Sequence, residues 1–302
     1  MRRSPGLRPL HPIRRQPQKK VPQTPIAQLL SKNGPTPFIG IYDTFSAALA
    51  AQHFPALFVS GFSFGASHYG LPDIGFIAWS DLVDFVLRIR RIVPNTPLLV
   101  DMDDGFGDAK IASHVTLALE QAGATGIVLE DQRRPRRCGH LGGKEILPLE
   151  EYLDKLSAVL ETRRDLFVVA RTDAGDEDEV LRRVAAFEKA GADAVLADGI
   201  LSLETLRRIR ETVSCPIAFN QMAGGKSPVV DLAQLGELGA NVIIYSTPTL
   251  FAAQKAIGDS LALLKSANGS LSPLLERDCI LADCNSQLEA HLTAAKENNR
   301  HV

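Results

Sequence analysis

The chain alternates short, unbroken apolar runs with longer stretches in which apolar residues recur every three or four positions. The runs are rich in β-branched residues and lack polar alternation, which is typical of strands buried on both faces of a parallel sheet. Eight such runs occupy residues 38–43, 56–61, 97–104, 126–131, 166–173, 194–198, 216–221 and 241–246. The pattern therefore predicts eight parallel strands with helices between them.

Three of the intervening stretches carry helix boundary signals. Residues 80–93 begin at Ser80, a residue type that caps helix N-termini. Residues 110–123 and 176–191 each end at a glycine, which is a common helix stop. We expect amphipathic helices over these three ranges.

A near-repeat supports one architecture. "QAGATGIVLED" at 121–131 and "KAGADAVLADG" at 189–199 each read as a helix end, a glycine turn and a strand, 68 residues apart. This spacing equals two strand–helix units, and eight units predict an α/β fold, a (β/α)8 TIM barrel over residues 25–268. An open doubly wound sheet is the alternative, but no Gly-x-Gly-x-x-Gly follows the first strand. Residues 269–302 are predicted to form a C-terminal helical extension.

Charge is distributed unevenly along the 302 residues. The net charge is −2, but residues 1–42 hold eight Lys or Arg and no acid, which leaves 25 basic against 35 acidic residues in the remainder. The Pro-rich, basic segment 1–24 is predicted to be a disordered tail, with an organelle transit peptide as the alternative. An acidic remainder argues against a nucleic-acid partner.

Two further features bound the class of protein. No apolar run approaches the roughly 20 residues of a membrane span, so no membrane partner is expected. Four cysteines without dense spacing predict free thiols in a reducing compartment, and hence a cytoplasmic location. They are Cys138, Cys215, Cys279 and Cys284.

Acidic residues close two neighbouring predicted strands, and in such a barrel the chemistry lies at the carboxyl ends of the strands. Asp101 and Asp103 lie at the end of the third strand and Glu130 lies at the end of the fourth. Three close carboxylates raise one another's pKa unless a cation neutralises them. Oxygen ligands without His or Cys spacing suit Mg²⁺ or Mn²⁺. The alternative is a salt-bridge network with Arg171 on the fifth strand.

The segment "RRPRRCGH" directly follows the fourth strand and is predicted to close over the site as a lid. A metal beside Arg171 and the backbone amides at Ser60 and Gly61 would receive an α-keto or α-hydroxy carboxylate and stabilise an enolate. Within the lid, Cys138 lies between Arg137 and His140, which would favour a thiolate able to transfer protons. The alternative is a small residue in a glycine turn.

Several motifs together resemble one known family, the isocitrate lyase/phosphoenolpyruvate mutase superfamily, over about residues 25–265. They are "GIYDTFSAALA", "VSGFSFGASHYGLPDIG", "VDMDDGFG", "LEDQRRPRRCGHLGGK", "ARTDA" and "AGADAVLADG". The resemblance implies a (β/α)8 barrel whose eighth helix is exchanged between the subunits of a homodimer or homotetramer. It also implies Mg²⁺ in the mouth and a small carboxylate or phosphonate substrate.

The resemblance assigns roles to the matching residues. The acids implied to hold the metal, largely through water, are Asp101, Asp103 and Glu130, with Asp73 of "GLPD" near them. The groups implied to grip the carboxylate of the oxo acid are Tyr42, Ser60, Gly61 and Arg171. Cys138 matches the lyase cysteine that protonates the departing enolate, and the other expected catalytic groups are Arg171, His140 and Tyr42. The remaining lid and substrate-binding residues are Arg136, Gly139, Asp198 and Asn220.

Four positions depart from the family pattern. Arg136 takes the place of a lysine, Leu129 of a frequent histidine, Asp198 of a common glutamate, and Met222 of a threonine usual in methylisocitrate lyases. These changes leave the substrate open. The expected activity is Mg²⁺-dependent carbon–carbon cleavage of a 2-hydroxy di- or tricarboxylate of methylisocitrate or dimethylmalate type. The alternatives are a phosphorylmutase of carboxyvinyl-carboxyphosphonate type, an oxaloacetate hydrolase or decarboxylase, and a non-catalytic barrel that serves as a scaffold or ligand sensor.

Overall fold

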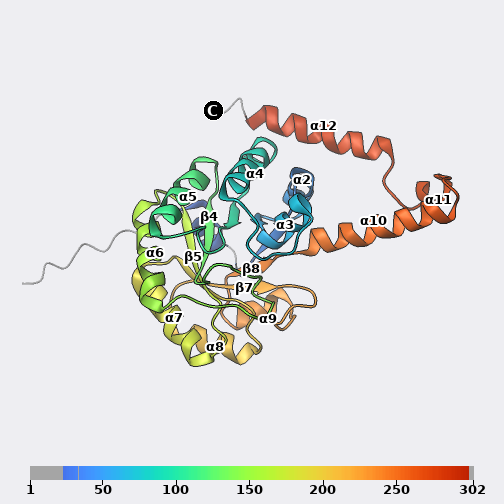
Figure 1. Ribbon diagram of the computed structural model, residues 1–302. Helices are drawn as coiled ribbons and strands as arrows, with labels where there is room; N and C mark the ends of the chain where they lie inside the picture. The colour runs from blue at the N-terminus through green and yellow to red at the C-terminus, as the bar shows by residue number, and fades with distance from the viewer. Residues whose placement is uncertain (1–22, 33, 299–302) are drawn as a thin grey trace, which may run out of the picture.

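Eight parallel strands close into a barrel in the computed structural model, which describes residues 23–32 and 34–298 (Figure 1). Each strand pairs with the next along the chain, and β8 pairs with β1. The strands are β1 (Thr36–Ile41), β2 (Ala56–Val59), β3 (Leu98–Asp101), β4 (Gly126–Glu130), β5 (Phe167–Thr172), β6 (Ala194–Ala197), β7 (Ile217–Gln221) and β8 (Val242–Tyr245). The predicted TIM barrel is confirmed, and the open doubly wound sheet is wrong. The predicted basic tail, 1–24, lies outside the described residues apart from its last two positions.

Helices surround the barrel. The helices that follow the strands are α2 (Thr44–His53), α4 (Trp79–Ile92), α5 (Ala109–Gln121), α6 (Leu149–Thr162), α7 (Glu177–Ala190), α8 (Leu203–Thr212), α9 (Leu232–Glu237) and α10 (Pro248–Ser266). The additional helices are α1 (Pro25–Lys32), α3 (Gly61–Tyr69), α11 (Ser272–Leu275) and α12 (Leu281–Asn298). The glycine stop of α7 is confirmed at Gly191, whose φ is 102°. The predicted Ser80 cap is wrong, because Ala78 is the N-cap of α4 and Ser80 lies inside the helix.

The barrel has an inner and an outer apolar core. The inner core fills the barrel with side chains such as Phe38, Leu99 and Val128, and the outer core lies between the strands and the helices. Ile26 of α1 is fully buried against the inner core, and a Cβ on Gly126 at the start of β4 would lie 2.7 Å from its Cδ1. Helix α1 therefore closes the amino end of the barrel, and the functional groups gather at the carboxyl end.

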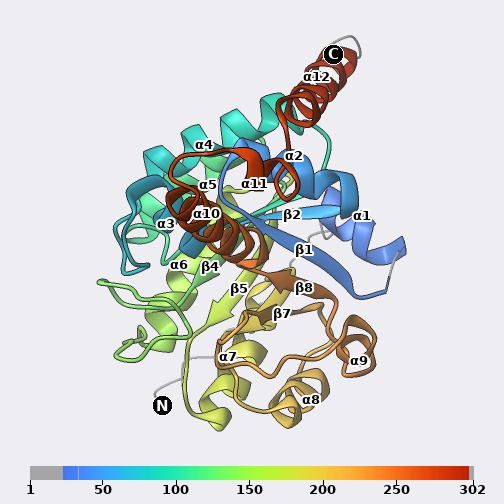
Figure 2. The same cartoon turned by 90° about the vertical axis from the view of Figure 1, so that its right-hand side faces the viewer.

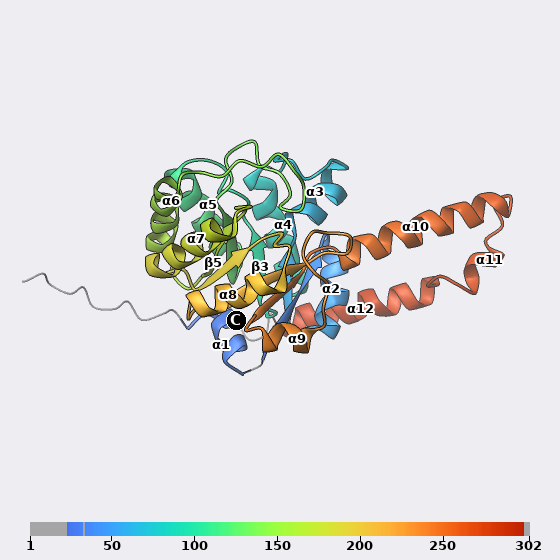
Figure 3. The ribbon, with the colours of Figure 1, turned by 90° about the horizontal axis from the view of Figure 1, so that it is seen from below.

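The C-terminal helices extend away from the barrel (Figures 1 and 2). Against the described remainder of the chain, α10 buries none of its residues. Seen from below, α10 projects outward and α12 returns toward the barrel (Figure 3), where the ring of His291 lies 6.5 Å from that of Phe45 on α2. No helix in the described ranges combines the length and hydropathy that crossing a bilayer requires.

Candidate active site

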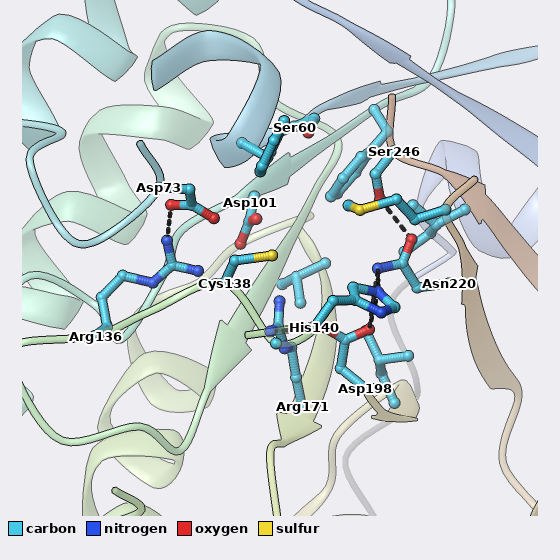
Figure 4. A pocket seen from close by; sticks show the side chains of 17 residues that line it. Ser60, Asp73, Asp101, Arg136, Cys138, His140, Arg171, Asp198, Asn220 and Ser246 are labelled. Atoms are coloured by element: carbon cyan, nitrogen blue, oxygen red, sulfur yellow. Dashed lines mark hydrogen bonds and ion pairs between the residues drawn. The ribbon is translucent and has the colours of Figure 1, made fainter. Parts of the chain in front are cut away.

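A small cavity at the carboxyl end of the barrel lies beneath the segment between β4 and α6 (Figure 4). This segment is held at its base by the bridge between Gln132 and Ile146 and by the hydrogen bond from the Arg133 N–H to the Glu145 carbonyl, at 2.8 Å. We call residues 132–146 the lid. The cavity has a volume of about 20 Å³, enough for a single ordered water. The site is thus closed by the lid.

The acids of β3 converge behind the cavity. A Cβ on Gly61 would lie 3.1 Å from both Asp101 Oδ2 and Asp103 Oδ1, so these two oxygens face the same point. Both carboxylate oxygens of Asp103 are buried and make no hydrogen bond within the described part of the chain. Buried carboxylate oxygens that accept no hydrogen bond are costly, so this position favours an additional cation.

The guanidinium of Arg136 lies among the acids. This side chain is 1% exposed, and its Nε lies 2.9 Å from Glu130 Oε1. Its Nη1 pairs with Asp73 and lies 3.4 Å from Asp103 Oδ1. The salt-bridge network that was the alternative to a metal is therefore present, with Arg136 as an additional member.

Burial dominates the electrostatics of these acids. It raises the pKa of Asp103 to about 8 and also raises the pKa values of Asp101 and Glu130, although Arg136 acts in the opposite direction on all three. The carboxylate oxygens of these acids are hard donors, the ligand type that Mg²⁺ and Mn²⁺ prefer. Among the described residues, no three Asp, Glu, His or Cys side chains form a ready-made ligand shell. The donor set therefore matches these ions in chemical type without a preformed ligand shell.

Arg171 at the end of β5 is surrounded by three carboxylates. Its Nε and Nη2 lie 3.0 and 3.1 Å from the two oxygens of Asp173, and Nη2 lies 2.8 Å from Asp198 Oδ2 and 3.3 Å from Glu130 Oε2. Asp198 in turn accepts a hydrogen bond of 2.9 Å from Asn220 Nδ2. The bidentate pair with Asp173 fixes the plane of the guanidinium.

The thiol of Cys138 points into the cavity between Asp101 and Arg171 (Figure 4). Burial raises its pKa to about 12, and Asp73 adds to the rise. The predicted thiolate is therefore wrong: Arg137 is exposed, and His140 is held neutral because burial lowers its pKa. Cys138 carries its proton at neutral pH.

His140 has a defined tautomer. Its Nδ1 accepts a hydrogen bond of 2.9 Å from the backbone N–H of Lys226, so the proton of the neutral ring lies on Nε2. That nitrogen lies 3.7 Å from Asp198 Oδ1 and 3.4 Å from Asn220 Nδ2. His140 thus links the lid to the ends of β6 and β7.

Most of the predicted site residues meet at the cavity. Those that line it are Ser60, Asp73, Asp101, Arg136, Cys138, Gly139, His140, Arg171, Asp198 and Asn220. Gly61, Asp103 and Glu130 lie behind this lining, and half-buried Tyr42 is not part of it. Two lysines that donate hydrogen bonds to lid carbonyls, Lys144 within the lid and Lys226 outside it, had no predicted role.

Acids, two arginines and a thiol at the carboxyl end of a closed barrel define a TIM-barrel enzyme site. Residues 26–265 match the family model described as phosphoenolpyruvate phosphomutase, and the chain belongs to this family, within the isocitrate lyase/phosphoenolpyruvate mutase superfamily. Its curated relatives include lyases of this superfamily.

Two curated relatives are 36% identical to the chain. One is 2,3-dimethylmalate lyase of Eubacterium barkeri, over 75% of this chain and 80% of the relative. The other is 2-methylisocitrate lyase of Aeropyrum pernix, over 76% of both chains. Among solved structures, oxaloacetate acetylhydrolase with 3,3-difluorooxalacetate superposes with a TM-score of 0.83 at 27% identity, over 91% of this chain and 95% of that one. Phosphonopyruvate hydrolase with oxalate and Mg²⁺ gives a TM-score of 0.78 at 25% identity, over 91% and 99%.

Proposed function

We propose that this protein is a Mg²⁺-dependent carbon–carbon lyase. Its substrate would be a 2-hydroxy di- or tricarboxylate of the dimethylmalate or methylisocitrate type, cleaved to an α-keto acid and a second carboxylate. The observation that carries the proposal is the position of the Cys138 thiol, which faces the same cavity as Arg171 and Asp101. The names of the two 36%-identical relatives supply the substrate class.

Arg171 would hold the carboxylate of the forming keto acid. Its guanidinium plane is fixed by Asp173 and lies at the cavity wall, so a planar carboxylate can meet this cation in a set orientation. Ser60 lines the same wall at the N-terminus of α3, where backbone N–H groups favour an anion. These groups orient the bond to be broken.

Cleavage would begin when the substrate hydroxyl loses its proton to a base that is not assigned. The electrons of the O–H bond form the new carbonyl, and those of the carbon–carbon bond pass to the departing fragment as an enolate. Cys138 donates its S–H proton to the carbon of this enolate, and the resulting thiolate regains a proton before the next turnover. A thiol whose pKa is raised to about 12 suits this role, because it is fully protonated at neutral pH.

The cation would be held by Asp101, Asp103 and Glu130, largely through water, with Asp73 near them. When bound, Mg²⁺ polarises the oxo group and stabilises the enolate charge. For Glu130 and Asp103 to serve the metal, Arg136 must relinquish its contacts with them, which are 2.9 and 3.4 Å in length.

The proposal is tested by incubation with 2,3-dimethylmalate and with 2-methylisocitrate, with and without Mg²⁺, followed by a coupled assay for pyruvate. Metal-dependent pyruvate release from either supports a lyase. Cys138→Ser should lose cleavage and retain oxalate binding, whereas the control Cys279→Ser, at an exposed position, should behave as the wild type. Phosphonopyruvate followed by phosphorus NMR tests the mutase, and its conversion to phosphoenolpyruvate would refute the lyase.

Hydrolysis of oxaloacetate is a second candidate. The TM-score of 0.83 to oxaloacetate acetylhydrolase favours it, because that superposition covers 91% of this chain. Release of oxalate and acetate from oxaloacetate, at a rate exceeding cleavage of the two lyase substrates, would support this candidate instead.

We also propose that the enzyme is a homodimer or homotetramer that exchanges α10 between subunits. The side chains of Ile257 and Leu261 on α10 are 59% and 61% exposed, and the helix projects from the barrel (Figure 3). Light scattering after gel filtration tests this proposal, and a monomeric mass would contradict it.

A further inference from the structure

Lys144, which ends the "CGHLGGK" segment, bridges two parts of the site. Its Nζ donates hydrogen bonds of 2.6 Å to the carbonyl of Gly139 and 2.8 Å to Asp173 Oδ1. The side chain of Lys144 is 13% exposed, and that of Asp173 is 0% exposed. A largely buried, charge-assisted bridge of this kind is geometrically specific.

Asp173 connects this bridge to the substrate-binding arginine. The same oxygen, Oδ1, lies 2.8 Å from Lys144 Nζ and 3.1 Å from Arg171 Nη2. The negative charge of Asp173 is thus shared between Lys144 and Arg171. Asp173 therefore neutralises Arg171 less than it would if Lys144 were absent. At the other end of the bridge, Gly139 directly follows Cys138, whose thiol lines the cavity.

From this geometry we propose that Lys144 is a positioning residue that couples two events at the site. It holds the lid closed with the Cys138 thiol over the cavity, and it tunes Arg171 for an anionic ligand through their shared carboxylate. The inference builds on the proposed function, because it assumes that Arg171 binds a substrate carboxylate.

Lys226 offers an internal comparison. Its Nζ donates to the carbonyl of Leu141 at 3.1 Å and lies 3.5 Å from that of Gly139, so it holds the same lid from the loop after β7. Both lysines therefore bind backbone carbonyls of the lid, but of the two, Lys144 is the one that also contacts Asp173. The two roles can be separated by mutation.

Two measurements that need no turnover test the proposal. The first is the affinity for oxalate in the presence of Mg²⁺, measured by calorimetry. The second is the rate of alkylation of Cys138 by iodoacetamide, followed by peptide mass spectrometry. We expect Lys144→Met to weaken oxalate binding roughly tenfold and to speed alkylation roughly tenfold. Lys226→Met should speed alkylation and leave oxalate affinity within twofold of the wild type. Lys144→Arg should restore most of both properties, because it returns a donor cation to the bridge.

Kinetics with the cleaved substrate add a further readout. Lys144→Met should raise KM through Arg171 and lower kcat through Cys138, whereas Arg137→Gln, at an exposed lid position, should change neither. Wild-type alkylation and oxalate affinity in a folded Lys144→Met would overturn the inference and leave the proposed lyase standing. An equal loss of oxalate affinity in Lys144→Met and Lys226→Met would also overturn it. If wild-type protein does not bind oxalate, the proposed function fails instead.

Discussion

Adding one methyl group to the lid should displace the proton donor. In Gly139→Ala the new Cβ would lie 1.9 Å from Asp198 Oδ2, 2.6 Å from Arg171 Nη2 and 2.8 Å from Asp173 Oδ1. A relaxed carbon contact needs about 3.5 Å. The closest of these contacts must therefore lengthen by about 1.6 Å, which the ion-paired side chains cannot easily provide.

We expect the lid to move instead, and the Cys138 thiol to move with it. A misplacement of about 1 Å can cost on the order of 10²-fold in rate, which corresponds to about 2.7 kcal/mol in the activation barrier. The assay is kcat for cleavage of the preferred substrate, together with the melting temperature as a check of folding.

Gly142→Ala is the matched control, because a Cβ at this lid position would meet no atom within 4 Å. It should retain wild-type kcat. If Gly139→Ala cleaves substrate within twofold of the wild-type rate, then Gly139 does not press against Arg171 and Asp198 in the working enzyme, and the reasoning is wrong.

Three further predictions concern the cation site, the thiol and the lid. Arg136→Gln should bind Mn²⁺ at least about tenfold more tightly than the wild type by EPR, about 1.4 kcal/mol, because the substitution removes a cation that competes for the acids. Arg137→Gln is the control, and equal Mn²⁺ affinities of Arg136→Gln and the wild type would contradict the competition. Cys138 should react with iodoacetamide at least about 10²-fold more slowly than exposed Cys279; comparable rates at the two sites would mean an open lid. Burial lowers the pKa of His140 from its ordinary 6.5, so the closed lid binds fewer protons there than the open lid. The closed lid is therefore fully stable above pH 6.5 and loses stability as the pH falls from 6.5 through the lowered pKa of His140. Lid amides should then exchange hydrogen faster at acid pH, and His140→Gln should abolish this pH dependence. Lid opening that does not depend on pH would contradict the prediction.

The barrel was predictable because its strands have a clear sequence pattern. Each is buried on both faces, so its apolar run has no polar interruption, and the predicted and observed limits differ by only a few residues. Helix starts were less predictable. Helix α4 extends to Trp79, whose ring packs 5.3 Å from that of His114 on α5, and this contact between helices outweighs the capping preference of Ser80.

The site was predictable in its membership and not in its electrostatics. Strand ends must converge at one edge of a barrel, which placed Asp101 and Arg171 together. The state of the Cys138 thiol depends on which neighbours point inward, and the sequence order of Arg137 and His140 does not encode this. The contact between His140 and the Lys226 backbone joins loops 86 positions apart, so no local pattern could indicate it.

The cavity of about 20 Å³ has one more consequence. The side chains of the lid fill the binding site and compete with every incoming ligand for the same contacts. Because the lid belongs to the same chain, its effective concentration at the site is high. Dissolved inorganic anions make few contacts and would seldom displace the lid. A substrate that can replace several of these contacts at once can do so, and Arg136 of the lid, which occupies the acids when the site is closed, thus selects for larger ligands.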